Sequence, residues 1–266
     1  MNHHHANVGD VMKHLALICV AKDMRPARYL EAHAGGFDYA MAGREGALPD
    51  GVWDFLRAAE TIGILDQSGF ARLLRDIAGS EDEPGIYPGS VRCVWETLGP
   101  NATYLLNDTD TEALTSVGYA LETRGAEAVL ARDDGIDWVL DTARAGDLVL
   151  IDPFNPSVPS PGHHTAAYDA FSRLVERGVI ALLWAAQPTD EDPASGVGGW
   201  GLRVHLRLDS PSSGMEGCAM FFGNVPVETQ ARVAQLAVAH GAVLTNGSVT
   251  VDAKPQPLGP TPEGDL

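Results

Sequence analysis

A run of four apolar residues at 148–151 is the clearest feature of the hydrophobic pattern, because no polar position interrupts it. Such a run is typical of a strand that is buried on both faces of a parallel sheet. It leads directly into Asp152, Pro153, Phe154 and Asn155. Open α/β sheets bind ligands at the carboxyl ends of their strands, so these residues form a candidate site. Asp-Pro and Asn-Pro are also ordinary turn signals, and a simple strand-ending turn is the alternative interpretation.

The pattern on either side of this run predicts alternating strands and helices. The alternation indicates one α/β domain over 1–253, with a mainly parallel sheet. Positions 51–80 keep a helical period, and we interpret about 48–82 as an inserted helical subdomain. Residues 254–266 are rich in Pro and acidic side chains, which predicts a disordered tail. The predicted strands are 102–106, 129–130, 179–184, 203–208 as an edge strand, 214–224 and a hairpin-like 242–251, and the predicted helices are 10–21 with Asp10 as its N-cap, 91–98, 112–120, 138–144, 166–177 and 228–240.

Composition and charge limit the classes of function. The chain has 266 residues, of which 45% are hydrophobic, so a sizeable core is expected. Its formal net charge is -18, from 18 Lys and Arg against 36 Asp and Glu. This charge argues against a polynucleotide or an anionic membrane as partner, although a basic patch assembled in three dimensions would still allow nucleic acid. No apolar run approaches the roughly 20 residues of a membrane span.

Cysteine and histidine usage adds little chemistry. Cys19, Cys93 and Cys218 are scattered and form no C-x-x-C pair, so we expect reduced thiols in a cytoplasmic protein, and no signal peptide is recognisable. Neither 3–5 (His-His-His) nor 163–164 (His-His) has a carboxylate at ligand spacing. We therefore predict no metal site, and the first run is either native or the remnant of a tag.

A second candidate lies at 28–39, where a predicted strand runs into Gly35 and Gly36. Glycines allow a ligand to approach the backbone closely, and a carboxylate before a small-residue turn opens many nucleotide pockets in doubly wound sheets. The segment is not a G-x-G-x-x-G fingerprint, so alone it is a weak signal. His14, taken alone, is best interpreted as a partly buried helix histidine.

Seven short motifs follow one another between about residues 5 and 227. They are H-A-N-V-G-D-V-M-K-H at 5–14, Y-L-E-A-H-A-G-G-F-D-Y at 29–39, Y-P-G-S-V at 87–91, N-D-T-D at 107–110, D-G at 134–135, L-I-D-P-F-N at 150–155, and G-M-E-G-C-A at 214–219 before N-V-P-V at 224–227. In order and spacing they resemble the motifs of the RlmJ-type bacterial methyltransferases, which methylate adenine-N6 in large-subunit ribosomal RNA. Each motif is weak by itself, and the common register makes the resemblance specific.

The resemblance implies a Rossmann-like methyltransferase fold that binds S-adenosylmethionine. In that family Asp108 would accept the ribose hydroxyls, Asp134 would accept the adenine amino group beside Gly135, and Asp152 would face the sulfonium and the acceptor. The complete set of cofactor contacts that the resemblance implies is His14, His33, Ser90, Asp108, Asp134, Gly135 and Asp152.

The departures from the family lie on the acceptor side. The family's Asp-Pro-Pro-Tyr motif holds an extruded adenine, whereas Phe154 and Asn155 replace its second Pro and its Tyr here. Ala185 stands where the family has an aromatic residue after a Trp, and the family's Asn-Pro-Pro-Trp has become Asn-Val-Pro-Val at 224–227. The cofactor half of the pattern is therefore retained, and the half that handles the base is altered.

We predict an S-adenosylmethionine-dependent methyltransferase that acts on a small aromatic N-heterocycle in bacterial specialised metabolism. An indole-like ring, methylated on carbon or nitrogen, fits on chemical grounds. Asp152 or a histidine (His5 or His14) would accept the ring proton, Asn155 would orient the ring, and Phe154 would pack on it. Two alternatives stay open: adenine-N6 methylation of ribosomal RNA, and a non-catalytic nucleotide-binding or scaffold subunit.

Overall fold

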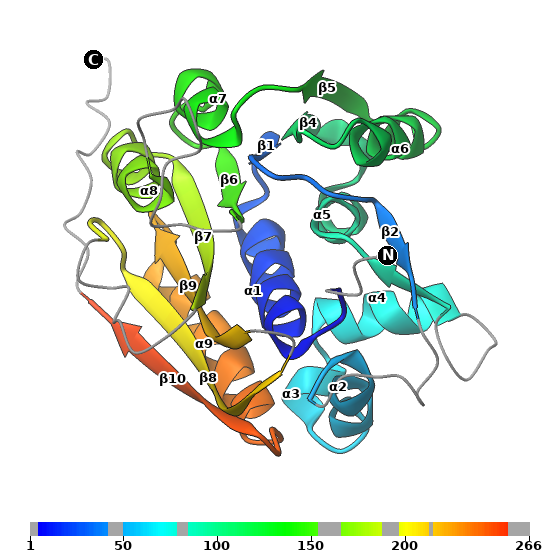
Figure 1. The fold of residues 1–266 in the computed structure, drawn as a ribbon, viewed down its shortest axis with the longest axis vertical. Helices are drawn as coiled ribbons and strands as arrows, with labels where there is room; N and C mark the ends of the chain where they lie inside the picture. Colours follow the sequence, from blue (N-terminus) through cyan, green and yellow to red (C-terminus); the bar gives the residue numbers. More distant parts are fainter. Residues whose placement is uncertain are drawn as a thin grey trace, which may run out of the picture.

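Eight strands form one sheet in the computed structural model, which describes residues 5–41, 50–78, 85–153, 166–187, 197–212 and 215–254. The strands are β1 (Arg28–Glu31), β4 (Thr103–Asn107), β5 (Glu127–Ala131), β6 (Leu148–Ile151), β7 (Ile180–Gln187), β8 (Leu202–Ser212), β9 (Met215–Gly223) and β10 (Gly247–Ala253). Their order is β10-β8-β9-β7-β6-β1-β4-β5 (Figure 1). The pairs among β7, β6, β1, β4 and β5 are parallel, and the three pairs that involve β8 or β9 are antiparallel. The predicted fold class, α/β and Rossmann-like with a mainly parallel sheet, is confirmed.

Strand β6 lies at the centre of the parallel part and has the bounds that its apolar run predicts. It pairs with β1 on one side and with β7 on the other. Strands β4 and β5 lie in sequence order on one side of β1, and β6 and β7 lie in sequence order on its other side. The order of the strands therefore reverses between β1 and β6, and ligands of doubly wound sheets bind at the carboxyl ends beside such a reversal.

Helices cover both faces of the sheet (Figure 1). The helices are α1 (Val8–Met24), α2 (Val52–Ala59), α3 (Gly63–Asp66), α4 (Gly69–Ala78), α5 (Ser90–Leu98), α6 (Thr111–Glu122), α7 (Gly135–Thr142), α8 (Ala167–Glu176) and α9 (Val227–Gly241). Alternate residues of β6 serve opposite faces, because Leu148 and Leu150 join the core with α1, α5, α6 and α9, whereas Val149 and Ile151 join the core with α7 and α8. This burial on both faces explains why no polar residue interrupts the run.

A third core lies beyond α1. Helices α2, α3 and α4 stand between the strands β2 (Asp38–Ala40) and β3 (Ile86–Pro88), which pair with each other. Apolar residues of α2 and α4 pack with Val11, Leu15 and Ile18 of α1. Since the other side of α1 belongs to the sheet core, this helix is enclosed by apolar residues on both sides. The region expected to be an insertion thus holds α1 against the sheet.

Several local predictions are wrong. Asn7, not Asp10, is the N-cap of α1, because the Asn7 carboxamide oxygen accepts the N–H groups of Gly9 and Asp10. Strand β8 is not an edge strand, since it lies between β10 and β9 and leaves β10 at the edge. Strand β10 begins at Gly247 rather than 242, and it pairs with β8 instead of its predecessor β9. Helix α7 begins three residues earlier than predicted, because Asp134 caps it.

The tail predicted at 254–266 lies outside the described residues beyond Lys254. Among the residues that the structure does describe, no helix combines the length and the apolar character of a membrane span.

Gly89 gives a test of the packing between β1 and α5. A Cβ atom at Gly89 would lie 2.1 Å from the carbonyl oxygen of Gly36, a backbone atom that cannot turn aside as a flexible side chain could. We expect Gly89→Ala to lower the free energy of unfolding by about 1–3 kcal/mol, as overpacking does. A Cβ at Gly63 would meet nothing within 4 Å, so Gly63→Ala should be neutral or slightly stabilising. Urea denaturation of both variants checks this, and equal stability of the two would contradict it.

Candidate functional site

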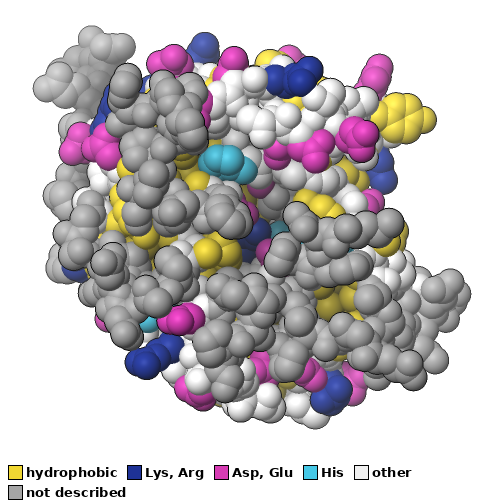
Figure 2. All heavy atoms as spheres, in the orientation of Figure 1, with side chains coloured by type: hydrophobic (Ala, Val, Ile, Leu, Met, Phe, Trp, Pro, Cys, Tyr) yellow, Lys and Arg dark blue, Asp and Glu magenta, His cyan; other side chains and the backbone are white. Residues whose placement is uncertain are grey.

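Acidic side chains gather where β1, β4 and β6 end. Glu31 is the last residue of β1, while Asp108 and Asp152 directly follow β4 and β6. These three strands are parallel neighbours in register, so their carboxyl ends lie at one edge of the sheet. Figure 2 shows a hollow in the middle of the molecular face. A basic side chain and acidic side chains lie on its floor, and a histidine lies at its rim.

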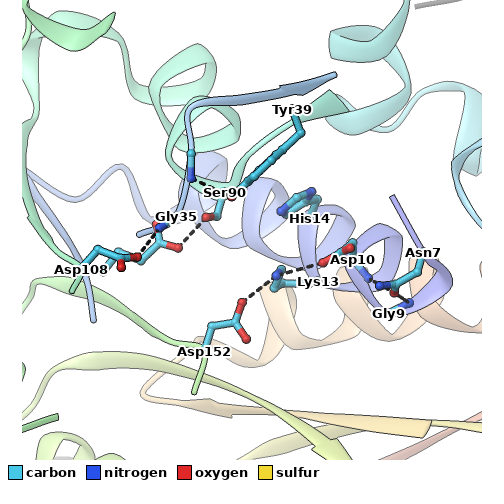
Figure 3. Close-up of polar contacts among 12 residues, drawn as sticks. Asn7, Gly9, Asp10, Lys13, His14, Gly35, Tyr39, Ser90, Asp108 and Asp152 are labelled. Carbon is cyan, nitrogen blue, oxygen red and sulfur yellow. Dashed lines mark hydrogen bonds and ion pairs between the residues drawn. The ribbon is translucent and has the colours of Figure 1, made fainter. Parts of the chain in front are cut away.

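Lys13 of α1 provides the cation that reaches this edge. Its Nζ lies 2.6 Å from Oδ2 of Asp152 and 3.1 Å from Oδ1 of Asp10 (Figure 3). The lysine is only 8% exposed. Burial alone would lower the pKa of Lys13, but the charges of Asp152 and Asp10 outweigh burial, and the pKa is raised above its ordinary value. Lys13 therefore stays charged and fixes one oxygen of Asp152.

Lys13 is not among the site residues predicted from the sequence. It is the sixth residue of α1, so the helix dipole gives no signal for it, and its contact with Asp152 is visible only in the tertiary structure. Asp10 and Asp152 both form ion pairs with the ammonium group of Lys13. Burial raises the pKa of Asp10 more than the Lys13 charge lowers it.

Glu31 forms a buried network with two hydroxyl groups. Its side chain is inaccessible to solvent. The Tyr29 hydroxyl donates to Oε2 at 2.6 Å, and the Ser90 hydroxyl donates to Oε1 at 2.5 Å. Burial raises the pKa of Glu31 to about 8, although both hydrogen bonds and the Lys13 charge oppose this rise. Ser90 is the first residue of α5, so this acid joins the end of β1 to the start of that helix.

The glycine turn after β1 is held by two side chains (Figure 3). The N–H of Gly35 donates to Oδ2 of Asp108 at 2.8 Å, and the N–H of Gly36 donates to the Tyr39 hydroxyl at 2.7 Å. Gly35 adopts φ +58°, which a residue with a Cβ rarely tolerates. Asp108 also accepts the N–H of Asp110 at 2.8 Å. Both carboxylate oxygens of Asp108 are thus fixed by backbone N–H groups.

Asp134 and Gly135 bring the start of α7 against the end of β1. The Asp134 carboxylate caps α7 by accepting the N–H groups of Ile136 and Asp137. A Cβ at Gly135 would lie 2.1 Å from the carbonyl oxygen of Ala32, so only glycine permits this approach. The contact places the predicted adenine-binding pair beside the predicted cofactor residue at 33.

The two histidines predicted to contact the cofactor lie in different surroundings. His33 lies beside Gly135, another predicted cofactor residue, whereas His14 lies beside Tyr87. Burial lowers the pKa of His33, and the charges of Asp152, Asp108 and Asp134 oppose this effect. Its buried Nδ1 has no hydrogen-bond partner within the described part of the chain.

His14 points instead into the core formed with the helical insertion. It is 2% exposed, and its Nδ1 lies 2.9 Å from the Tyr87 hydroxyl. Its ring also meets Phe70 edge-on. Burial lowers the pKa of His14 well below its ordinary range, and the Lys13 charge adds to this effect. This geometry favours a structural role, and the predicted contact of His14 with cofactor or acceptor stays a prediction.

Some of the candidate residues predicted from the sequence lie outside the part of the chain that the structure describes. Phe154, Asn155 and the pairs at 3–4 and 163–164 lie outside the described residues. His5 is described, and its ring stacks on Tyr39. Within the described ranges, no group of three or more His, Cys, Asp or Glu residues is arranged to hold a metal ion. The three cysteines are free thiols, two of them buried.

Comparisons with known proteins establish the fold. No protein-family model and no curated protein matches the chain. Protein LPL1258 from Legionella pneumophila, of family DUF519, has a TM-score of 0.79 at 16% sequence identity, and the match covers 94% of this chain and 98% of that one. The two proteins therefore share a fold over nearly their whole lengths. The identity is too low to show a common activity, and membership of the RlmJ-type family stays a prediction.

Two weaker matches are methyltransferases. One is a methyltransferase from Geobacter sulfurreducens, with a TM-score of 0.40 at 13% identity over 78% of this chain and 75% of that one. The other is an S-adenosylmethionine-dependent O-methyltransferase from Thermotoga maritima, with a TM-score of 0.39 at 8% identity over 79% of this chain and 64% of that one.

Replacing Lys13 tests the buried ion pair. Lys13→Met leaves Asp10 and Asp152 close together without a counter-charge, and breaking a buried pair in this way costs about 3–5 kcal/mol of unfolding free energy. Adding Asp10→Asn should recover part of the loss, because it removes one of the two stranded charges. The exposed Lys22, in the last turn of the same helix, supplies the matched control Lys22→Met. Chemical denaturation at pH 7 measures all four proteins, and equal losses at the two lysines would refute the ion-pair assignment.

Glu31→Gln tests the buried acid through the pH dependence of stability. The pKa of Glu31 rises from 4.5 to about 8 on folding, so the folded state binds a proton that the unfolded state releases between these values. Wild-type stability should therefore fall relative to the Gln variant as pH rises from 5 to 8, by at most about 1.4 kcal/mol per pH unit. Denaturation curves at pH 5, 6.5 and 8 measure the difference, and a constant difference would show that Glu31 does not titrate in this window.

Proposed function

We propose that the protein is an S-adenosylmethionine-dependent methyltransferase whose acceptor is a small aromatic N-heterocycle. The observation that carries this proposal is the placement of Asp108 and Asp152 at the carboxyl ends of β4 and β6, on either side of β1 and the reversal point of the sheet, with Asp134 at the start of α7 packed against the end of β1. Lys13 forms an ion pair with Asp152, and the same ammonium group also pairs with Asp10, so one positive charge faces two carboxylates. A pocket with an excess of negative charge suits a cofactor that carries a positive sulfonium.

The residues present fit this cofactor. A buried His33 nitrogen lacks a partner among the described residues, and this ring lies beside the start of α7, where glycine at 135 permits the close contact with Ala32. Asp108 would hold the ribose hydroxyls, Asp134 with the Gly135 backbone would hold the adenine, and Ser90 and His33 would complete the contacts. When bound, the cofactor supplies a methyl group activated by the positive charge on its sulfur.

The protein's own part in the reaction centres on Asp152. Lys13 fixes Oδ2 of this residue, and Oδ1 has no hydrogen bond to any described residue. Oδ1 is therefore the atom that would accept a hydrogen bond from a ring N–H, which makes the acceptor ring more nucleophilic, and it would take the proton when the methyl group is transferred. The Asp152 side chain is 19% exposed, so the protein around it already excludes most of the water from this carboxylate.

Charge supports a small acceptor over a polynucleotide. The net charge is -18. Several basic side chains that the structure describes are paired with acids, including Arg92 with Asp38 and Arg203 with Asp252. Paired cations are poorly available for phosphates, whose neutralisation dominates nucleic-acid affinity. Adenine-N6 methylation of ribosomal RNA is the alternative, and the motif resemblance is what favours it.

A labelled-methyl assay tests the proposal. S-adenosylmethionine with a labelled methyl group is offered with indoles and related N-heterocycles, and in parallel with unmodified ribosomal RNA. We expect label in a heterocycle and none in RNA. Asp152→Asn should lower kcat at saturating cofactor by at least about 100-fold, the usual range for loss of a positioned acid or base. Asp169→Asn, at an exposed position of α8, is the matched control.

Each other outcome changes the assignment. Label in RNA would establish the alternative activity. Cofactor binding without label in either acceptor would favour the non-catalytic subunit. Full activity of the Asp152→Asn variant would remove Asp152 from the reaction.

A further inference from the structure

The first strand-to-helix crossover of a doubly wound fold usually offers a phosphate two kinds of group. These are the backbone N–H groups of its glycine turn and the N-terminus of the following helix. In this protein the corresponding groups are the amides of Gly35 and Gly36 and the start of α5. Both amides are already bonded to protein side chains, and the start of α5 packs against the glycine turn.

Both glycine amides are directed at protein atoms. Gly35 donates to Asp108, and Gly36 donates to the Tyr39 hydroxyl. The Tyr39 ring lies tightly over the turn, because a Cβ built at Gly35 would lie 2.4 Å from the Tyr39 hydroxyl oxygen. A Cβ built at Gly36 would lie 3.2 Å from the same ring. An incoming phosphate would therefore find neither N–H group available.

The start of α5 packs closely against the same turn. Gly89 is pressed against the carbonyl oxygen of Gly36, since a Cβ atom at Gly89 would lie 2.1 Å from that oxygen. The hydroxyl of Ser90, the first residue of the helix, donates to the buried Glu31 carboxyl. The side chain of the first helical residue is thus turned toward a buried carboxyl group of the protein.

We propose that Tyr39 and Asp108 are specificity residues that close the glycine turn to phosphate. The pocket then binds adenosine ligands that lack a phosphate on the 5′ side and rejects adenine nucleotides. Tyr39 acts by occupying the Gly36 amide, and Asp108 acts by occupying the Gly35 amide and by repelling a second anion. This inference rests on the proposed function, since it explains how a cofactor built on adenosine is selected in the presence of nucleotides that carry the same base and sugar.

Calorimetric titration of the full-length protein tests the inference without an acceptor. The ligands are S-adenosylhomocysteine, adenosine and adenosine monophosphate, and the variants are Tyr39→Phe and Asp108→Asn. Tyr119→Phe, on a tyrosine of α6 that is 69% exposed, is the matched control. We expect the wild-type protein to bind the monophosphate at least about tenfold more weakly than adenosine, a tenfold ratio being about 1.4 kcal/mol. Each specificity variant should narrow that ratio about fivefold, and the control should leave it unchanged.

The ratio separates specificity from a structural role. A variant that merely loosens the fold would weaken both ligands together and leave their ratio intact, which would overturn the inference. Equal binding of adenosine and its monophosphate by the wild-type protein would also overturn it, while binding of S-adenosylhomocysteine would leave the proposed function standing. If the wild-type protein binds none of the three ligands, the cofactor assignment itself fails and the inference fails with it.

Discussion

The ion pair between Lys13 and Asp152 is the contact on which the site depends. It joins residues 139 positions apart, and it connects α1 to the end of the central strand. A buried ammonium without a counter-charge is strongly unfavourable, so α1 can lie across the sheet only in the register that brings the two groups together. Lys13 also lies 5.3 Å from the centre of the Trp184 ring of β7. One side chain of α1 thus contacts residues of both β6 and β7, which are already paired with each other.

The other acids of the site are fixed by backbone N–H groups rather than by cations. Asp108 accepts from the glycine turn and from its own loop, and Asp134 accepts from the first turn of α7. Asn107 adds a clamp, since its carboxamide bonds to the backbone of Ala32 and Asp133. These bonds hold the loops after β1, β4 and β5 together before any ligand arrives. The site therefore combines a preorganised backbone with an excess of negative charge, and both favour a cationic, phosphate-free ligand.

The likeness to LPL1258 over nearly the whole chain, at 16% identity, shows how few residue identities the fold requires. What the fold requires is the pattern of buried positions, such as the two faces served by alternate residues of β6. Activity does not follow from that pattern, because function depends on the particular side chains placed at the strand ends. Those side chains, and not the fold, support the methyltransferase proposal.

The sequence by itself determined the α/β class, the bounds of β6 and the helical period of residues 51–80, because these depend on local hydrophobic periodicity. It also marked Asp152 as a candidate, since strand ends in parallel sheets are predictable sites. Only the tertiary structure decided that Lys13 bonds to Asp152, that Tyr39 holds Gly36 and that His14 faces Tyr87. It also decided that β8 lies inside the sheet, because β10, which follows α9 in the chain, pairs with the free side of β8. The physical reason is the same in each case: a hydrophobic period reports which face of an element is buried, whereas a contact depends on which distant element is packed against that face.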